Sequence, residues 1–329
     1  KLLRMVRSAD DAQFVDSRTA HALADRSDQQ TLGLHFSSRL TENLLRPVTV
    51  RQNGAEPHEV HLGTFLPNFA SMLDSYDQLV EGVEPVFEHL ASKSTILTGA
   101  RIESLEYLDN SVVLEASITG EQRKRLEFDV VVLALPAHAA ASLLTPHAED
   151  LGAELSQILY SPATVALVEY DRDVFRPDVR AITLDGPCSN VGCYGREELN
   201  IARFTFSGSE AREQNPTRER IDTWIEDAES ALSDHLHFEG ASKKNVAVRH
   251  WPRALCGFSQ FHPRRLQRIN RLMNDLPRVG LAGDYMKGTL IEACVRSGSE
   301  AADRVMRYDL RTSLAATEGH RPTPASNSI

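Results

Sequence analysis

The stretch Val279–Arg307, VGLAGDYMKGTLIEACVRSGSEAADRVMR, carries the strongest fold signal in the chain. A short apolar run ends in Ala282-Gly283-Asp284, and a turn with Gly288 leads to a helical pattern that begins near Leu290. Gly283 lets a ligand approach the backbone closely, and a helix start offers N–H groups and a positive dipole end. The stretch predicts a strand, a turn and a helix that suit an anion or an electron-rich carbonyl. An ordinary strand–turn–helix is an equally good interpretation from the residues alone.

A second buried strand is predicted upstream. Asp129–Leu135, DVVVLAL, is a continuous apolar run, which is typical of a buried parallel strand. Pro136 follows at the predicted start of a helix that ends at Leu144. Turn residues separate further short strands, expected at Ser94–Leu97, Arg101–Leu108, Ser111–Ser117, Lys124–Phe128 and Arg278–Ala282.

The rest of the chain predicts helices and a second β region. Residues 1–74 read as helical and irregular, with a helix ending at Pro47. A helix over Ser75–Ala91 would be capped by Ser75 and Gln78 and kinked at Pro85. Further strands are expected at Ala163–Tyr170, Arg180–Leu184, Asn200–Phe206 and Val246–Trp251, and helices at Thr217–Leu236 and Pro263–Met273. Alternating strands and helices favour an α/β fold with an antiparallel region over residues 155–255.

Composition excludes several classes of protein. The net charge of −10 argues against a nucleic-acid partner. The four cysteines form no CxxC pair and no cluster with zinc spacing, so no metal is expected and reduced, cytoplasmic thiols are favoured. No apolar run is long enough to span a membrane. The chain opens KLLRMVRSAD, without an initiator Met or an apolar leader, which is typical of a fragment.

The stretch quoted first resembles the C-terminal flavin motif of the superfamily that holds protoporphyrinogen oxidases, flavin amine oxidases and phytoene-desaturase-like enzymes. The matching positions are Leu281-Ala-Gly-Asp284, Gly288, Ile291-Glu292, Val295, Ser297-Gly298 and Ala301-Ala302. Three other stretches agree with the resemblance: Asp129–Ala137, Thr95–Leu105 with Ile102, and Val246–Phe258 with Trp251, although Cys256 stands where the superfamily usually has proline.

The resemblance implies FAD as the cofactor and an incomplete FAD-binding Rossmann-like domain of the glutathione-reductase type. Its domains would be residues 75–154 and 256–308, beside a substrate domain made of a helical part (1–74) and a β-rich part (155–255). Residues 309–329 would be a disordered tail. The expected cofactor contacts are Ile102, through its main chain, and Pro136, Trp251, Gly283, Asp284, Gly288, Thr289, Leu290 and Ile291. No catalytic residue is identified.

One part of the superfamily pattern is missing. Its members open with a βαβ unit bearing G-x-G-x-x-G, which binds the pyrophosphate, and no such sequence occurs here. The chain alone is therefore expected to bind FAD weakly or not at all. The unit could precede this sequence, have been removed, or be supplied by a second chain.

The resemblance is closest to bacterial protoporphyrinogen-oxidase-like proteins, which implies hydride transfer to flavin N5 from a small-molecule organic substrate that is flat, electron-rich and large for its class. Flavin amine oxidases place a lysine near the position of Ala166, where this strand has none. The double glycine usual before the helix is also absent at Ser75–Gly82. An amine oxidase, a desaturase and a non-catalytic partner subunit remain alternatives. Arg39, Arg46 and Arg51 are candidates for binding substrate carboxylates, or are simply solvated.

Overall fold

The computed structural model describes residues 2–9, 11–73, 79, 81–195, 197–213 and 215–318. The chain divides into two compact units. The first unit joins Lys1–His89 to Ile158–Arg264, and the second joins Leu90–Gln157 to Arg265–Ile329. In the part of the chain that is described, no helix is both long and apolar enough to cross a membrane.

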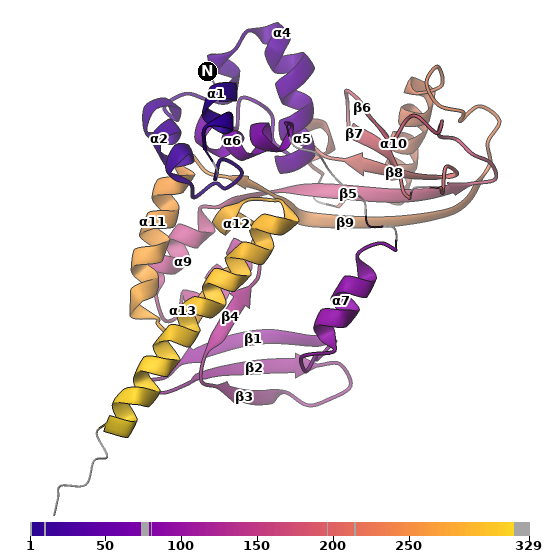
Figure 1. The fold of residues 1–329 in the computed structure, drawn as a ribbon. Coiled ribbons are helices and arrows are strands. Elements are labelled where there is room, and N and C mark those ends of the chain that lie inside the picture. Colours follow the sequence, from indigo (N-terminus) through magenta and orange to yellow (C-terminus); the bar gives the residue numbers. More distant parts are fainter. Residues whose placement is uncertain are drawn as a thin grey trace, which may run out of the picture. The chain divides into compact units, whose positions relative to one another are not determined.

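The first unit is built on an antiparallel sheet of five strands in the order β6-β7-β8-β5-β9 (Figure 1). Its longest ladder pairs β5 with β9, so residues almost a hundred positions apart lie side by side. The strands are β5 (Leu159–Tyr170), β6 (Ala181–Thr183), β7 (Cys188–Cys193), β8 (Ile201–Phe206) and β9 (Lys243–Phe258). The antiparallel region predicted between residues 155 and 255 is therefore present, with β7 as a strand that the sequence analysis did not identify.

One face of this sheet packs against α10 (Arg218–Ala231). Thr217 caps the helix by accepting a hydrogen bond from the Arg220 N–H at 3.2 Å. Trp224 lies buried on its apolar stripe, with its ring 5.3 Å from that of Phe206 on β8. Alternate strand residues therefore point into this core, and the residues between them point to the opposite face.

Among its described residues, the helical part of the first unit contains seven short α-helices and a π-helical turn. Two prolines expected to end or kink helices instead lie in first turns, where proline is tolerated. Pro47 is in the first turn of α5, directly after the π-helix, and Pro85 is the second residue of α7 (Glu84–Ala91). The predicted cap residues Ser75 and Gln78 lie outside the described residues. The other elements are α1 (Leu2–Arg7), α2 (Arg18–Ser27), α3 (Leu32–His35), α4 (Ser38–Leu40), η1 (Thr41–Leu45), α5 (Arg46–Asn53), α6 (Leu62–Ser71) and η2 (Ser209–Ala211).

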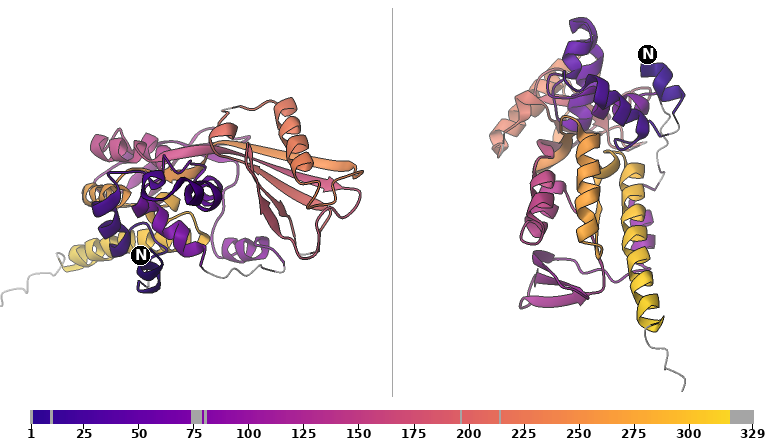
Figure 2. Two further views of the ribbon diagram at one scale, coloured as in Figure 1. Left: turned by 90° about the horizontal axis from the view of Figure 1, so that it is seen from above. Right: turned by 90° about the vertical axis from the view of Figure 1, so that its left-hand side faces the viewer.

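In the residues that are described, the second unit holds two small sheets, five α-helices and one short 3₁₀-helix. An antiparallel sheet is formed by β1 (Ala100–Tyr107), β2 (Val112–Ile118) and β3 (Lys124–Phe128), and β4 (Val131–Ala134) pairs in parallel with β10 (Val279–Ala282). Figure 2 shows α11 and α13 as neighbouring helices. Arg304 on α13 donates a hydrogen bond to the carbonyl of Met273, the first residue of η3 directly after α11, at 2.5 Å. The helices are α8 (Ala137–Leu144), α9 (Glu149–Ser156), α11 (His262–Leu272, which begins in the first unit), η3 (Met273–Asp275), α12 (Asp284–Lys287) and α13 (Ile291–Glu318).

Three expectations are corrected in the second unit. Ser94–Leu97 forms no strand, because this segment is exposed and has no ladder partner among the described residues. The run Asp129–Leu135 does form a parallel strand, but only Leu133 is buried and Val132 is 37% exposed. The helix α13 continues to Glu318, so residues 309–318 are helical, while the rest of the predicted disordered tail, 319–329, lies outside the described residues.

Candidate cofactor site

The parallel pair β4–β10 brings two predicted contact regions to one edge. Ala134 pairs with Ala282 at the ends of the strands, so Pro136 and Gly283 follow on the same side. A Cβ built on Gly283 would lie 3.3 Å from the Leu135 carbonyl oxygen and 2.9 Å from the Tyr285 ring. Ligands of open parallel sheets bind beyond the carboxyl ends of the strands. The predicted positions therefore meet where a ligand of this fold class would bind.

Gly283 is held in place by a residue on the following helix. The Ser297 hydroxyl accepts a hydrogen bond from the Gly283 N–H at 2.9 Å and donates to the Cys294 carbonyl at 2.9 Å. Ser297 is buried. Gly283 itself has φ 150° and leaves no room for a side chain. A glycine and a serine far apart in sequence thus fix the end of β10 against α13.

The turn between β10 and α13 contains a short helix rather than an open loop. Asp284 begins α12 and its carboxylate accepts a hydrogen bond from the Tyr285 N–H at 2.8 Å. Lys287 is buried and its ammonium lies 2.9 Å from the Glu300 carboxylate on α13. Gly288 closes the turn with φ 141°, a conformation that favours glycine. The ion pair anchors the turn to the helix that follows.

The start of α13 is accessible. Its first intrahelical hydrogen bond runs from the Cys294 N–H to the Leu290 carbonyl, at 3.1 Å. Ile291 is 76% exposed, and Thr289 and Leu290 are half-buried. Burial and the nearby Asp284 carboxylate raise the pKa of the Cys294 thiol, which favours its neutral form. The predicted contacts Gly283, Asp284, Gly288, Thr289, Leu290 and Ile291 therefore form one continuous surface of turn and helix.

Ile102 lies on β1 of the same unit, at a break in the strand register. Ile102 pairs with Ala116, whereas Ser104 pairs with Glu115, so Glu103 is a bulge residue. A bulge leaves backbone groups outside the ladder, which is compatible with a main-chain contact at Ile102. Trp251 belongs to the other unit, on β9, and is 47% exposed. Of the nine predicted residues, Trp251 lies in the first unit and the other eight lie in the second.

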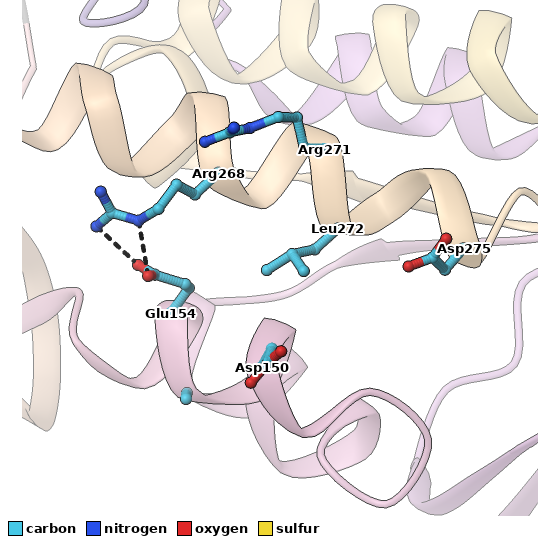
Figure 3. A pocket seen from close by; sticks show the side chains of 7 residues that line it. Asp150, Glu154, Arg268, Arg271, Leu272 and Asp275 are labelled. Carbon is cyan, nitrogen blue, oxygen red and sulfur yellow. Dashed lines mark hydrogen bonds and ion pairs between the residues drawn. The ribbon is translucent and has the colours of Figure 1, made fainter.

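A pocket of about 440 Å³ also lies in the second unit, between α9 and α11 (Figure 3). It contains none of the predicted contacts. The Glu154 carboxylate bonds Arg265 at 2.5 Å and Arg268 at 2.7 Å, and the hydrogen bond from Arg268 lowers the pKa of Glu154. Because these charges satisfy one another across two helices, we interpret the pocket as a structural ion-pair cluster.

The sequence analysis missed two contacts that hold the turn between β10 and α13. Ser297 was named only as a position that matches the superfamily motif, and the Lys287–Glu300 ion pair was not predicted. The spacing of fourteen residues between Gly283 and Ser297 carries no local signal. The Ser297-Gly298 step within the quoted stretch was the available hint.

Comparison with known proteins agrees with this geometry. The family model described as flavin containing amine oxidoreductase matches residues 3–306. A solved structure named "Putative protoporphyrinogen oxidase", from Exiguobacterium sp. 255-15, superposes with a TM-score of 0.64 at 17% identity. The match covers 86% of this chain and 67% of that one. At this identity the solved structure shows a shared fold.

The family match spans most of the chain and includes the turn, the parallel strands and the helix start described above. It confirms the superfamily expected from the quoted stretch, and it confirms FAD as the cofactor, since the family is flavin-containing. The chain belongs to the flavin-containing amine oxidoreductase family.

Proposed function

We propose that the protein is an FAD-dependent oxidoreductase and that the turn from Gly283 to Ile291 holds the flavin end of the cofactor. One observation carries the proposal: a glycine turn at the carboxyl edge of a parallel strand pair opens onto an accessible helix start. When bound, FAD supplies the acceptor for a hydride from a substrate carbon, at flavin N5. No base in the chain is assigned to that step.

Each residue of the turn has a defined task in this proposal. Gly283 and Gly288 let the cofactor approach the backbone, because neither carries a side chain there. The Asp284 carboxylate accepts hydrogen bonds from sugar-alcohol or phosphate-linked hydroxyls. The N–H groups of Leu290 and Ile291, at the positive end of α13, stabilise negative charge at the N1/O2 edge. Thr289 and Pro136 border the same surface, Ile102 would bind adenine through its main chain, and Trp251 would face the flavin.

The pyrophosphate half of the site would be supplied by a βαβ unit with a glycine-rich turn, from residues outside this sequence or from a second chain. The exposure of β4 supports this idea. Among the described residues, β4 pairs only with β10, and Val132 and Ala134 are exposed on it. Val132 and Ala134 point to one face of the strand pair, where the helix of an added βαβ unit would cover both side chains. We also propose that the domains are divided as the resemblance implies. We propose further that the protein acts in the cytoplasm.

We favour a protoporphyrinogen-oxidase-like activity, in which the substrate is large, flat and electron-rich. The amine oxidase alternative needs a lysine near Ala166. Ala166 is fully buried in the core between the sheet and α10, and its strand contains no lysine. A base at that position would therefore point into the core of the first unit.

The experiment combines a flavin spectrum with anaerobic reduction. The chain is purified together with the unit that bears the glycine-rich turn, and bound FAD is quantified by absorbance. We expect stoichiometric flavin in the completed protein and little in the 329-residue chain. Reduction by porphyrinogens but not by primary amines would support the favoured activity. Flavin-free completed protein would instead support a non-catalytic subunit and would contradict the proposal.

A further inference from the structure

One strand of the small antiparallel sheet in the second unit has an open edge. Among the described residues, β1 pairs with β2 on one side and with no strand on the other. An open edge leaves main-chain N–H and C=O groups able to meet a side chain or a ligand. Ile102, the proposed adenine contact, lies on this strand. The groups that face the open edge therefore decide what the strand can bind.

A histidine from outside the sheet occupies one point of this edge. The His147 Nε2 atom lies 2.5 Å from the Leu105 carbonyl oxygen. The acceptor is a carbonyl, so Nε2 carries the hydrogen and donates it. Because this carbonyl meets a side chain rather than β2, it points to the open edge. Leu105 and its partner Leu114 are then a pair without hydrogen bonds between them.

The main-chain groups of Ile102 face the same edge. Pairs with and without hydrogen bonds alternate along an antiparallel ladder, and Ala116, the partner of Ile102, lies two residues beyond Leu114 on β2. The bulge residue Glu103 lies on β1 alone and leaves this alternation intact. The Ile102 N–H and C=O therefore point outward, about 7 Å along the strand from those of Leu105. An adenine edge presents an N–H donor beside an acceptor nitrogen, which these two groups match.

The helix α8 connects this edge to the other end of the proposed site. It begins directly after Pro136, beyond the carboxyl end of β4, and its residues Ala137 and Ala140 are fully buried. His147 follows in the next turn, where its N–H donates to the Leu144 carbonyl at 2.9 Å. A helix of eight residues is a rod of about 12 Å. The hydrogen bond from His147 thus ties the far end of this rod to β1.

We propose that His147 is a positioning residue for the adenine half of FAD. By donating to Leu105, it holds the open edge of β1 so that the Ile102 N–H and C=O stay at a fixed distance from Pro136. The inference rests on the proposed function, because it takes Ile102 as the adenine contact. His147 acts through β1 and α8, so its effect falls on cofactor binding.

The test compares ligands that carry one half of the cofactor each. FAD and FMN are titrated into the completed protein by flavin fluorescence, and ADP is titrated by competition with FAD. ADP carries adenine without flavin, and FMN carries flavin without adenine. We expect His147→Phe, which keeps a ring but has no donor, to weaken FAD and ADP binding about fivefold and FMN binding less than about twofold. A merely structural role would lower all three affinities alike.

Conservative and control variants sharpen the test. His147→Gln restores an N–H donor and should return FAD affinity to within about twofold of wild type. Ser142→Ala is the matched control, because the Ser142 hydroxyl also donates to a carbonyl, that of His138 at 3.0 Å, but within α8. It should leave all three affinities unchanged. Should His147→Phe fail to fold, His147→Ser, whose hydroxyl is too short to reach Leu105, should give the same result.

Equal losses of FAD and FMN affinity in His147→Phe would overturn the proposal, and so would unchanged FAD and ADP binding. Equal FAD affinities of His147→Gln and His147→Phe would overturn it too, because the donor would then not matter. In these results the wild type still binds FAD, so the proposed function stands. A completed wild-type protein that binds neither FAD nor ADP would overturn the proposed function, and this inference with it.

Discussion

At the scale of single residues, Ser297 on α13 links its helix to Gly283, at the start of the turn between β10 and α13. Replacing Ser297 with Ala leaves the Gly283 N–H buried without an acceptor, which costs about 1–3 kcal/mol. We expect Ser297→Ala to lower the free energy of unfolding by this amount and to weaken FAD binding in the completed protein. Urea unfolding and flavin titration measure the two effects.

The same helix offers a control for this prediction. The Ser299 hydroxyl bonds only its own helix, at the Val295 carbonyl, and is exposed. Ser299→Ala should change stability by less than about 0.5 kcal/mol and leave flavin affinity unchanged. Equal effects of the two substitutions would show that Ser297 does not position the turn.

Asp28 gives a prediction about pH. Its carboxyl is fully buried; one oxygen accepts the Gly63 N–H at 2.9 Å and the other has no partner among the described residues. Burial raises its pKa, against the opposing hydrogen bond. The folded protein thus binds this proton more tightly than the unfolded chain, whose Asp pKa is about 3.9. The stability contributed by that proton is present below the unfolded pKa and is lost as pH rises through the folded pKa.

Asp28→Asn should remove this pH dependence. We expect the difference in unfolding free energy between the variant and the wild type to shift in favour of the variant as pH rises above about 4. Urea titrations at several pH values between 4 and 7 would measure it. A difference that stays constant with pH would mean that the Asp28 pKa is the same in both states.

At the scale of elements, the turn between β10 and α13 depends on glycine. Gly288 is buried with φ 141°, so Gly288→Val introduces backbone strain of about 1–3 kcal/mol and fills the approach to the cofactor. We expect this variant to lose flavin binding, measured by absorbance after gel filtration. Gly298→Ala is the control, since its Cβ would meet nothing within 4 Å and should stabilise α13 by about 0.4–1 kcal/mol. Wild-type flavin content in Gly288→Val would contradict the placement of the site.

The helices α9 and α11 are joined by the ion pairs of Glu154. Because Arg268 and Arg265 lower the Glu154 pKa, the stability that these pairs contribute is present above the unfolded pKa and is lost as pH falls through the folded pKa. Glu154 is partly exposed, so the effect of Glu154→Gln should be about 1 kcal/mol or less at neutral pH and should vanish in acid. Thermal unfolding at pH 7 and at successively lower pH, down to about 3, would check this, with Arg218→Gln as an exposed-pair control.

Local patterns account for the elements that the sequence predicted well. The apolar run before Pro136 and the small residues of α13 are patterns of a few consecutive or nearby positions. Such local patterns can be recognised in the sequence, so β4, β10 and the turn between β10 and α13 could be predicted. The strand expected at Ser94–Leu97 failed because β-propensity without a ladder partner does not make a strand. Pro47 and Pro85 were misplaced because a proline that starts a helix and one that ends it look alike in sequence.

At the scale of the whole molecule, long-range pairing limited the prediction. Each unit is made of two segments that are separated in the sequence by a segment of the other unit. No local pattern indicates that β9 extends from Lys243 to Phe258 beside β5.

The open side of β4 has a consequence for handling the protein. Unpaired strand edges with exposed apolar side chains, such as Val132 here, are templates for edge-to-edge association between copies. We expect the chain produced alone to form soluble aggregates as its concentration rises, detectable by light scattering. Supplying the proposed βαβ unit during synthesis should suppress them, whereas adding free FAD to the finished chain should not.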